Sequence, residues 1–312
     1  MSPTSPVWTE IDAPRSLRRT LSVHRIGSGD PTTRLSDGAF TRATITPDGP
    51  GTLTIRWTGD PAHHADSGVD AEAWGPGADW LLARVDRLTG ATDRSGVFLH
   101  AHPAVERSLR LTRGGRIGAS DTLYHHLLPT IIAQRITGGE AVRQWARLCY
   151  ALGEPAPGPF ALVATMRLPP APATLYRRPA WWFHPLGIES KRARALTEVA
   201  RHADHLWRWA EAGADLAASK LALLPGLGPW TIGSTLGPVL GDPDAVPVGD
   251  YHHPNTVAWA LAGEPRADDD RMLQLLEPYR GQRGRVLWAL TSAAGPAPKF
   301  GPRQRILPMA RW

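Results

Sequence analysis

A single carboxylate, Asp250, stands in surroundings that suit chemistry. It ends a loop, residues 241–250, that is rich in glycine and proline, and a helix is expected to begin near Tyr251. A buried carboxylate in such a place can stabilise positive charge that develops on a substrate, and it can align an attacking water. Aspartate is also a favoured helix N-cap, and one residue can fill both roles.

The sequence before this loop predicts a tight hairpin between two helices. Residues 224–231 read Leu-Pro-Gly-Leu-Gly-Pro-Trp-Thr, an amphipathic helix precedes them, and residues 232–240 can form another. Gly226 and Gly228 tolerate positive φ, and Pro229 suits the first turn of a helix. Backbone N–H groups at the helix start would then point outward and bind phosphate. The same pattern also fits a plain packing corner.

Histidine pairs and arginine clusters are weaker candidates. The pairs stand at positions 63/64, 125/126 and 252/253, and no cysteine or third histidine lies at zinc spacing, so we expect no catalytic metal. His252 and His253 are close enough to Asp250 to touch a ligand or tune the site. Arginines in two groups are candidate phosphate contacts or, equally, solvated surfaces: Arg107, Arg110, Arg113 and Arg116, and Arg280, Arg283 and Arg285.

The composition indicates a basic globular protein. Of the 312 residues, 42% are hydrophobic and 21% charged, and the formal charge of +6 suits a polyanionic partner. Cys149 is the only cysteine, which excludes an internal disulfide and a cluster held by four cysteines of this chain. Residues 1–19 lack the apolar core of a signal peptide, and no apolar run could span a membrane. We therefore expect a soluble cytoplasmic protein.

Hydrophobic periodicity places the hairpin in a mainly helical region. Residues 51–57 alternate like a strand, residues 39–45 are a hairpin partner, and residues 71–88 turn helical. Beyond residue 120 we expect a helix capped by Ser120 or Asp121 and ended by Gly138-Gly139, and one helix over residues 190–209. The predicted fold class is α+β: a small N-terminal α/β domain with an antiparallel sheet, residues 1–88, and a helical domain, residues 89–312.

The hairpin, the loop and Asp250 together resemble the helix-hairpin-helix (HhH-GPD) DNA glycosylase superfamily, whose signature combines these three features. Within it the chain is most similar to the AlkA-type 3-methyladenine DNA glycosylases. The resemblance extends over nearly the whole chain, including residues 128–137, 184–196 and 278–288. It implies two helical subdomains with a lesion cleft between them and the hairpin at residues 224–228.

The resemblance implies a monofunctional DNA glycosylase that acts in base excision repair. Such an enzyme flips alkylated purines of the 3-methyladenine and 7-methylguanine type out of double-stranded DNA and hydrolyses their N-glycosidic bond, here as a monomer without a redox cofactor. Asp250 would be the catalytic carboxylate, because this cleavage develops positive charge on the sugar. A glycosylase for deaminated or bulky bases, and a non-catalytic DNA-binding protein, remain alternatives.

Three residues are expected to form the base pocket by this resemblance. Trp230 stands where glycosylases that also cleave the strand carry a Schiff-base lysine, so we expect no lyase activity. Trp230 and Trp288 would stack on the flipped base, where cation–π attraction favours a cationic purine by about 1–2 kcal/mol. Ser234 replaces an aromatic residue of the best-known member, which makes the pocket wider or more polar. The alternative for each tryptophan is a place in the core.

The resemblance also assigns DNA contacts and an ion site. Gln134 would approach the lesion, and Arg135 takes the place of an apolar wedge, where it can fill the gap left by the flipped base. The hairpin would contact DNA through Gly226, Leu227, Gly228 and Thr231. Backbone carbonyls of Ala222, Leu224 and Leu227 would hold a Na⁺ or K⁺ ion that bridges to a phosphate.

Overall fold

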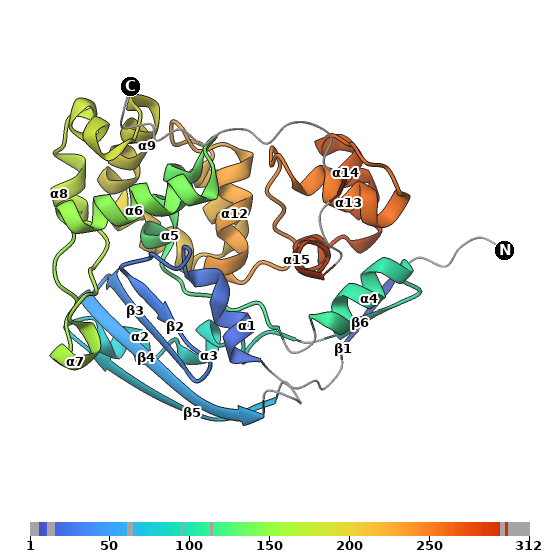
Figure 1. Cartoon of the computed structure of the whole chain (residues 1–312), viewed down its shortest axis with the longest axis horizontal. Coiled ribbons are helices and arrows are strands. Elements are labelled where there is room, and N and C mark those ends of the chain that lie inside the picture. Colours follow the sequence, from blue (N-terminus) through green and yellow to red (C-terminus); the bar gives the residue numbers. More distant parts are fainter. Residues whose placement is uncertain are drawn as a thin grey trace.

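The computed structural model describes residues 6–10, 16–60, 65–94, 96–112, 115–293 and 297–298, and Figure 1 shows their arrangement. A sheet of N-terminal strands, a large central group of helices and a smaller C-terminal group of helices are its three parts. His63, His64 and Arg113 lie outside the described residues. No helix of the described part is long and apolar enough to cross a membrane.

The N-terminal part forms a four-stranded antiparallel sheet in which β2 to β5 pair in chain order. β3 and β4 form a hairpin that turns at Pro47 and Asp48, and Gly49, which follows the turn, has a φ of +119° that favours glycine. Leu21, Phe40 and Ile55 belong to the core between this sheet and its short helices. The predicted strand over residues 51–57 and its partner are confirmed. The elements are α1 (Leu17–Leu21), η1 (Ser22–His24), β2 (Thr33–Leu35), β3 (Ala39–Thr46), β4 (Gly49–Asp60), β5 (Ala65–Trp74), α2 (Ala78–Leu82) and α3 (Val85–Leu88).

The segment expected to be helical from residue 71 begins as a strand. β5 continues to Trp74, because pairing with β4 satisfies its backbone and Ala71 and Ala73 alternate against the sheet core. Only after the turn at residues 75–77 does the chain become helical, as α2 and α3. Strand pairing with a neighbour overrides the local spacing of apolar residues here.

The central group packs around α5, whose residues Leu123 to Ile132 are all buried. Helices α6, α9, α10 and α12 lie against it and share its core, which includes Trp145 and Leu196. The elements are α5 (Leu123–Ala133), α6 (Gly138–Leu152), α7 (Phe160–Val163), α8 (Pro172–Tyr176), η2 (Ala180–Leu186), α9 (Ser190–Arg201), α10 (Ala203–Glu211), α11 (Ala214–Leu221) and α12 (Pro229–Leu240).

Three helix boundaries in this group differ from the predictions. Thr122 is the N-cap residue of α5, in place of Ser120 or Asp121. The pair Gly138-Gly139 begins α6 and does not end α5, because the Thr137 hydroxyl caps the new helix by accepting a hydrogen bond from the Glu140 amide. The helix expected over residues 190–209 is divided at His202 into α9 and α10.

The C-terminal group gathers segments from both ends of the chain (Figure 1). β1 pairs antiparallel with β6, and Phe98 of β6 and Val105 of α4 share a core with Val257 and Val286. A strand from residues 1–88 therefore pairs outside that range, and the domain boundary at residue 88 stays a prediction. The elements are β1 (Val7–Glu10), β6 (Gly96–Leu99), α4 (Pro103–Leu111), α13 (His253–Ala262), α14 (Asp269–Leu276), η3 (Glu277–Tyr279) and α15 (Arg283–Ala293).

Candidate active site

The predicted hairpin joins α11 to α12. Leu224 and Leu227 anchor it in the central core, and the Leu227 amide donates to the Leu224 carbonyl. Gly226 has φ of +89°, and a Cβ there would lie 2.7 Å from the Cβ of Ala195. Both the backbone conformation and the close approach of α9 therefore require glycine at this position.

The outer side of the hairpin presents free backbone donors. Gly226 and Gly228 are exposed, and Pro229 occupies the first turn of α12. The amides of Gly226, Gly228 and Trp230 donate to no other group among the described residues. Together with the positive end of the α12 dipole, they form an arrangement that suits a phosphate.

Gln134 and Thr231 brace this hairpin from within. The Gln134 side-chain nitrogen donates to the Gly226 carbonyl and to the Thr231 hydroxyl, both at 2.9 Å. Thr231 is 1% exposed, so its side chain faces the protein interior. Arg135, which follows the end of α5, is exposed, has φ of +57° and has no side-chain partner among the described residues. Of these three side chains, only that of Arg135 is wholly free for a ligand.

The loop over residues 241–250 is clamped against the start of α15. The Arg283 guanidinium binds the Asp244 carboxylate, and the Arg285 amide donates to the Pro243 carbonyl. A Cβ at Gly284 would lie 2.4 Å from the Ala245 carbonyl oxygen, so the helix can approach this closely only with glycine there. The clamp fixes the loop relative to α15, which carries Trp288.

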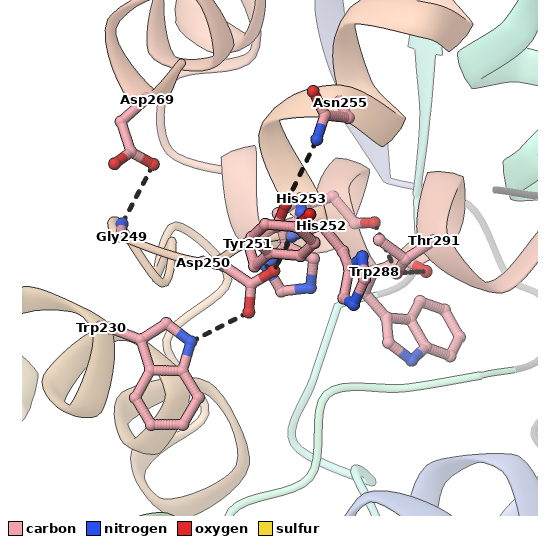
Figure 2. Close-up of polar contacts among 11 residues, drawn as sticks. Trp230, Gly249, Asp250, Tyr251, His252, His253, Asn255, Asp269, Trp288 and Thr291 are labelled. Atoms are coloured by element: carbon pink, nitrogen blue, oxygen red, sulfur yellow. Dashed lines mark hydrogen bonds and ion pairs between the residues drawn. The ribbon is translucent and has the colours of Figure 1, made fainter. Parts of the chain in front are cut away.

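Asp250 lies at the end of this loop and caps the start of α13 (Figure 2). Its Oδ1 accepts hydrogen bonds from the amides of His252 at 2.7 Å and His253 at 2.9 Å, and its Oδ2 accepts one from the Trp230 indole at 3.0 Å. Partial burial by itself would raise the pKa of Asp250, but the charge that His253 carries when protonated and these three donors together lower it below its ordinary value. The carboxylate is therefore ionised at neutral pH.

A cavity of about 220 Å³ lies between α12 and α15, and it is lined by His253, which contacts Asp250, but not by Asp250 itself. Ser234, His253 and Trp288 line it, together with residues of α1, the segment 116–118 and the loop 242–247. Trp230 does not line it: Figure 2 shows the indoles of Trp230 and Trp288 on opposite sides of Asp250. The structure thus brings Ser234 and Trp288 together in one cavity, whereas Trp230 lies outside it and is hydrogen-bonded to Asp250.

The sequence left the role of His253 open, and the structure places this side chain against both Asp250 and the cavity. Its Nδ1 lies 3.7 Å from Oδ1 of Asp250, and its ring lines the cavity. Burial lowers the pKa of His253 although Asp250 opposes the effect, and His252 lowers it further. The signal for this placement is its position three residues after Asp250, whose side chain accepts the His253 amide at the start of α13 and so lies near this residue.

Comparison with known proteins finds similarity in structure and not in sequence. No family model matches the chain, and no curated protein sequence matches it. The 3-methyladenine DNA-glycosylase from Archaeoglobus fulgidus superposes with a TM-score of 0.68 at 15% identity, over 91% of this chain and 96% of that one.

An 8-oxoguanine glycosylase/lyase from Clostridium acetobutylicum, in complex with double-stranded DNA, superposes with a TM-score of 0.61 at 14% identity, over 93% of this chain and 96% of that one. This chain has the helix-hairpin-helix DNA glycosylase fold. The fold that the resemblance implies is thereby confirmed, and so is the α+β class with its small N-terminal sheet.

Proposed function

We propose that this protein is a monofunctional DNA glycosylase that hydrolyses the N-glycosidic bond of alkylated purines in double-stranded DNA. The observation that supports this most directly is the position of Asp250. An ionised carboxylate is held by three donors, one of them Trp230 in the first turn of the helix that follows the hairpin. It contacts His253, which lines a cavity of about 220 Å³.

The chemistry follows from the charge of this group. Cleavage of the bond leaves positive charge on the sugar, and a fixed carboxylate nearby stabilises that charge in the transition state. Because the charge of protonated His253 and then the hydrogen-bond donors lower the pKa of Asp250, the group stays ionised at neutral pH. Its hydrogen bonds also fix its orientation before the substrate arrives, so no reorganisation is needed during the reaction.

The size and lining of the cavity support a single base as the group that is bound. Its volume of about 220 Å³ lies below the ~300 Å³ at which pockets for drug-sized ligands begin. Trp288 offers an aromatic face to a cationic methylpurine. Trp230, which donates to Asp250 through its indole N–H, has a second role in orienting the carboxylate.

The arrangement of lysines supports hydrolysis without strand cleavage. A Schiff-base mechanism needs an amine at the site. The corresponding hairpin position is Trp230, and Lys220, ten residues earlier, is exposed on α11.

DNA would lie across the hairpin and the end of α5. The amides of Gly226 and Gly228 would hold a phosphate, and Arg135 would occupy the space vacated by the flipped base. A Na⁺ or K⁺ ion bound by backbone carbonyls of the hairpin is part of this proposal. The carbonyl oxygens of Ala222 and Leu227 accept no hydrogen bond from the backbone of the described residues, so both have lone pairs for an ion, whereas that of Leu224 also accepts the Leu227 amide.

The test is the variant Asp250→Asn assayed on duplexes that each carry one lesion. We expect wild-type protein to release 7-methylguanine or 3-methyladenine and the variant to be at least about 100-fold slower in single-turnover assays. Affinity for DNA with an abasic-site analogue should be retained. Unchanged excision by the variant would refute the role of Asp250, and damaged-DNA binding without any base release by wild type would favour a non-catalytic DNA-binding protein.

A second candidate substrate class is favoured by Ser234. Ser234 lines the cavity in place of the aromatic residue that the best-known member of the resembled family carries, so its hydroxyl could hold a neutral lesion by a hydrogen bond. The same panel of duplexes, extended to deaminated and bulky bases, distinguishes the two classes by their relative excision rates.

A further inference from the structure

We propose that His253 and Asp250 act as a dyad in which the imidazole of His253 accepts the proton of the attacking water. This inference rests on the proposed hydrolysis and adds a second group to it. It assigns a catalytic role to a histidine whose role the sequence left open.

Asp250 is a weak base. Burial opposes the effect, but the charge of protonated His253 and then three hydrogen-bond donors hold the pKa of Asp250 below its ordinary value. A carboxylate of this kind stabilises a cation well, but it has little tendency to take a proton from water. Hydrolysis therefore calls for a second group with a higher proton affinity.

His253 lies between the Asp250 carboxylate and the cavity, where a base would be needed. Its Nδ1 is buried without a hydrogen-bond partner and lies 3.7 Å from Oδ1 of Asp250. That separation is too long for a hydrogen bond, but contacts in catalytic sites commonly shorten when substrate binds. With the proton on Nδ1, facing the carboxylate, the lone pair of the other ring nitrogen, Nε2, is left for the cavity that the ring lines.

The ring of His253 is in the charge state that a base requires. Burial and the nearby His252 lower the pKa of His253 against the opposing effect of Asp250, so at neutral pH the imidazole is uncharged and can accept a proton. The other charged groups that line the cavity are Arg19, Arg116 and Asp242. The two arginines oppose an added positive charge there, whereas Asp242 and Asp250 favour it.

In the proposed step, water replaces the base at C1′ and His253 takes up one proton. The bond between C1′ and the base nitrogen breaks, and its electron pair leaves with the methylpurine, which changes from cation to neutral base. The water oxygen bonds to C1′, and one water proton passes to Nε2 of His253. The resulting imidazolium is stabilised by the Asp250 carboxylate until the proton returns to solvent.

The test compares wild type with His253→Gln on a duplex carrying one 7-methylguanine, in single-turnover assays from pH 5 to 8. This substrate is already cationic, so its departure needs no protonation. We expect the wild-type rate to rise from pH 5 to a plateau near neutrality. The variant should lose the rise and be about 100-fold slower at the plateau.

Matched controls separate the dyad from a structural role. His252→Gln should keep the rise with pH, because its exposed ring does not line the cavity. His253→Ala should recover activity when imidazole is added. Thermal unfolding and binding to an abasic-site analogue report whether each variant is folded, and His253→Asn replaces His253→Gln if the latter is not.

The outcomes distinguish the two proposals. If wild type and Asp250→Asn differ as expected but His253→Gln keeps the wild-type rate and pH profile, the dyad is refuted and the glycosylase proposal stands. If wild type excises no lesion, the glycosylase proposal fails and the dyad falls with it.

Discussion

Two carboxylates in this protein are held by nearly the same set of donors, yet only Asp250 contacts a residue, His253, that lines the cavity between α12 and α15. Asp250 accepts hydrogen bonds from a tryptophan indole and two backbone amides. Asp30 accepts them from the Trp145 indole at 3.0 Å, from the amides of Ile26 and Thr32 and from the Thr32 hydroxyl. Asp30 is 7% exposed and lies where the N-terminal sheet meets α5 and α6. Asp250 is only partly buried and contacts His253, which lines the cavity between α12 and α15.

Each carboxylate also has histidine nearby. The ring nitrogens of His125 contact the hydroxyls of Thr44 and Thr32, and its ring packs near Trp145. Burial, aided by Arg42 and neighbouring histidines, lowers the pKa of His125 well below its ordinary value. We propose that the same set of donors stabilises the fold at Asp30, where solvent is excluded, and orients a reactive carboxylate at Asp250, which contacts a cavity-lining residue.

The largest effect that tests this contrast is expected for Asp30→Ala. The substitution leaves the Trp145 indole and the amides of Ile26 and Thr32 without an acceptor in a buried place, so we expect a loss of about 3 kcal/mol in the free energy of unfolding. Denaturant titration measures it. Excision per folded molecule should stay unchanged in Asp30→Ala. Asp250→Asn should instead lose excision and keep its stability. If Asp30→Ala loses excision while its stability is retained, Asp30 is not the structural member of the pair.

A smaller effect concerns the stability of the fold in acid and His126, which follows His125 in α5 and is also buried. Burial and then the charge of Arg42 lower its pKa to about 3. The unfolded chain binds a proton near pH 6.5 and the folded chain does not, so stability falls as pH drops below about 6.5. At pH 5 this one histidine accounts for ~2 kcal/mol of lost stability.

The variant His126→Asn tests this by its pH dependence. The stability that wild type loses between pH 7 and pH 5 should be smaller by ~2 kcal/mol in the variant, as followed by denaturant titration at each pH. Above pH 7 the two stability curves should run parallel. Equal losses in both proteins between pH 7 and 5 mean that His126 is protonated in the folded state.

The smallest effect is expected for the two indole donors. Trp230→Phe keeps an aromatic ring but removes the hydrogen bond to Asp250, and we expect excision to slow about fivefold, which is about 1 kcal/mol, with stability retained. Trp145→Phe removes the corresponding bond to Asp30, and there the loss should appear in unfolding. If both substitutions alter the same property, the two clusters do not differ in role.

Sequence by itself determined the hairpin, the loop and Asp250, because each depends on local chemistry. Gly226 takes a positive φ, Pro229 begins a helix, and a Gly/Pro-rich loop ends in a carboxylate, all within 27 consecutive residues. The antiparallel hairpin of β3 and β4 was predictable for the same reason, since alternation and a Gly/Pro turn lie within a short stretch.

Only the tertiary structure decided which side chains meet. The cavity joins α1, residues 116–118, α12, the loop and α15, and no spacing in the sequence relates these segments. For this reason the expected pocket of Trp230, Ser234 and Trp288 became a cavity lined by the last two, with Trp230 bound to Asp250. The strand at Ala71 and the place of Asp30 likewise depend on neighbours distant in sequence, whose hydrogen bonds and packing outweigh local preference.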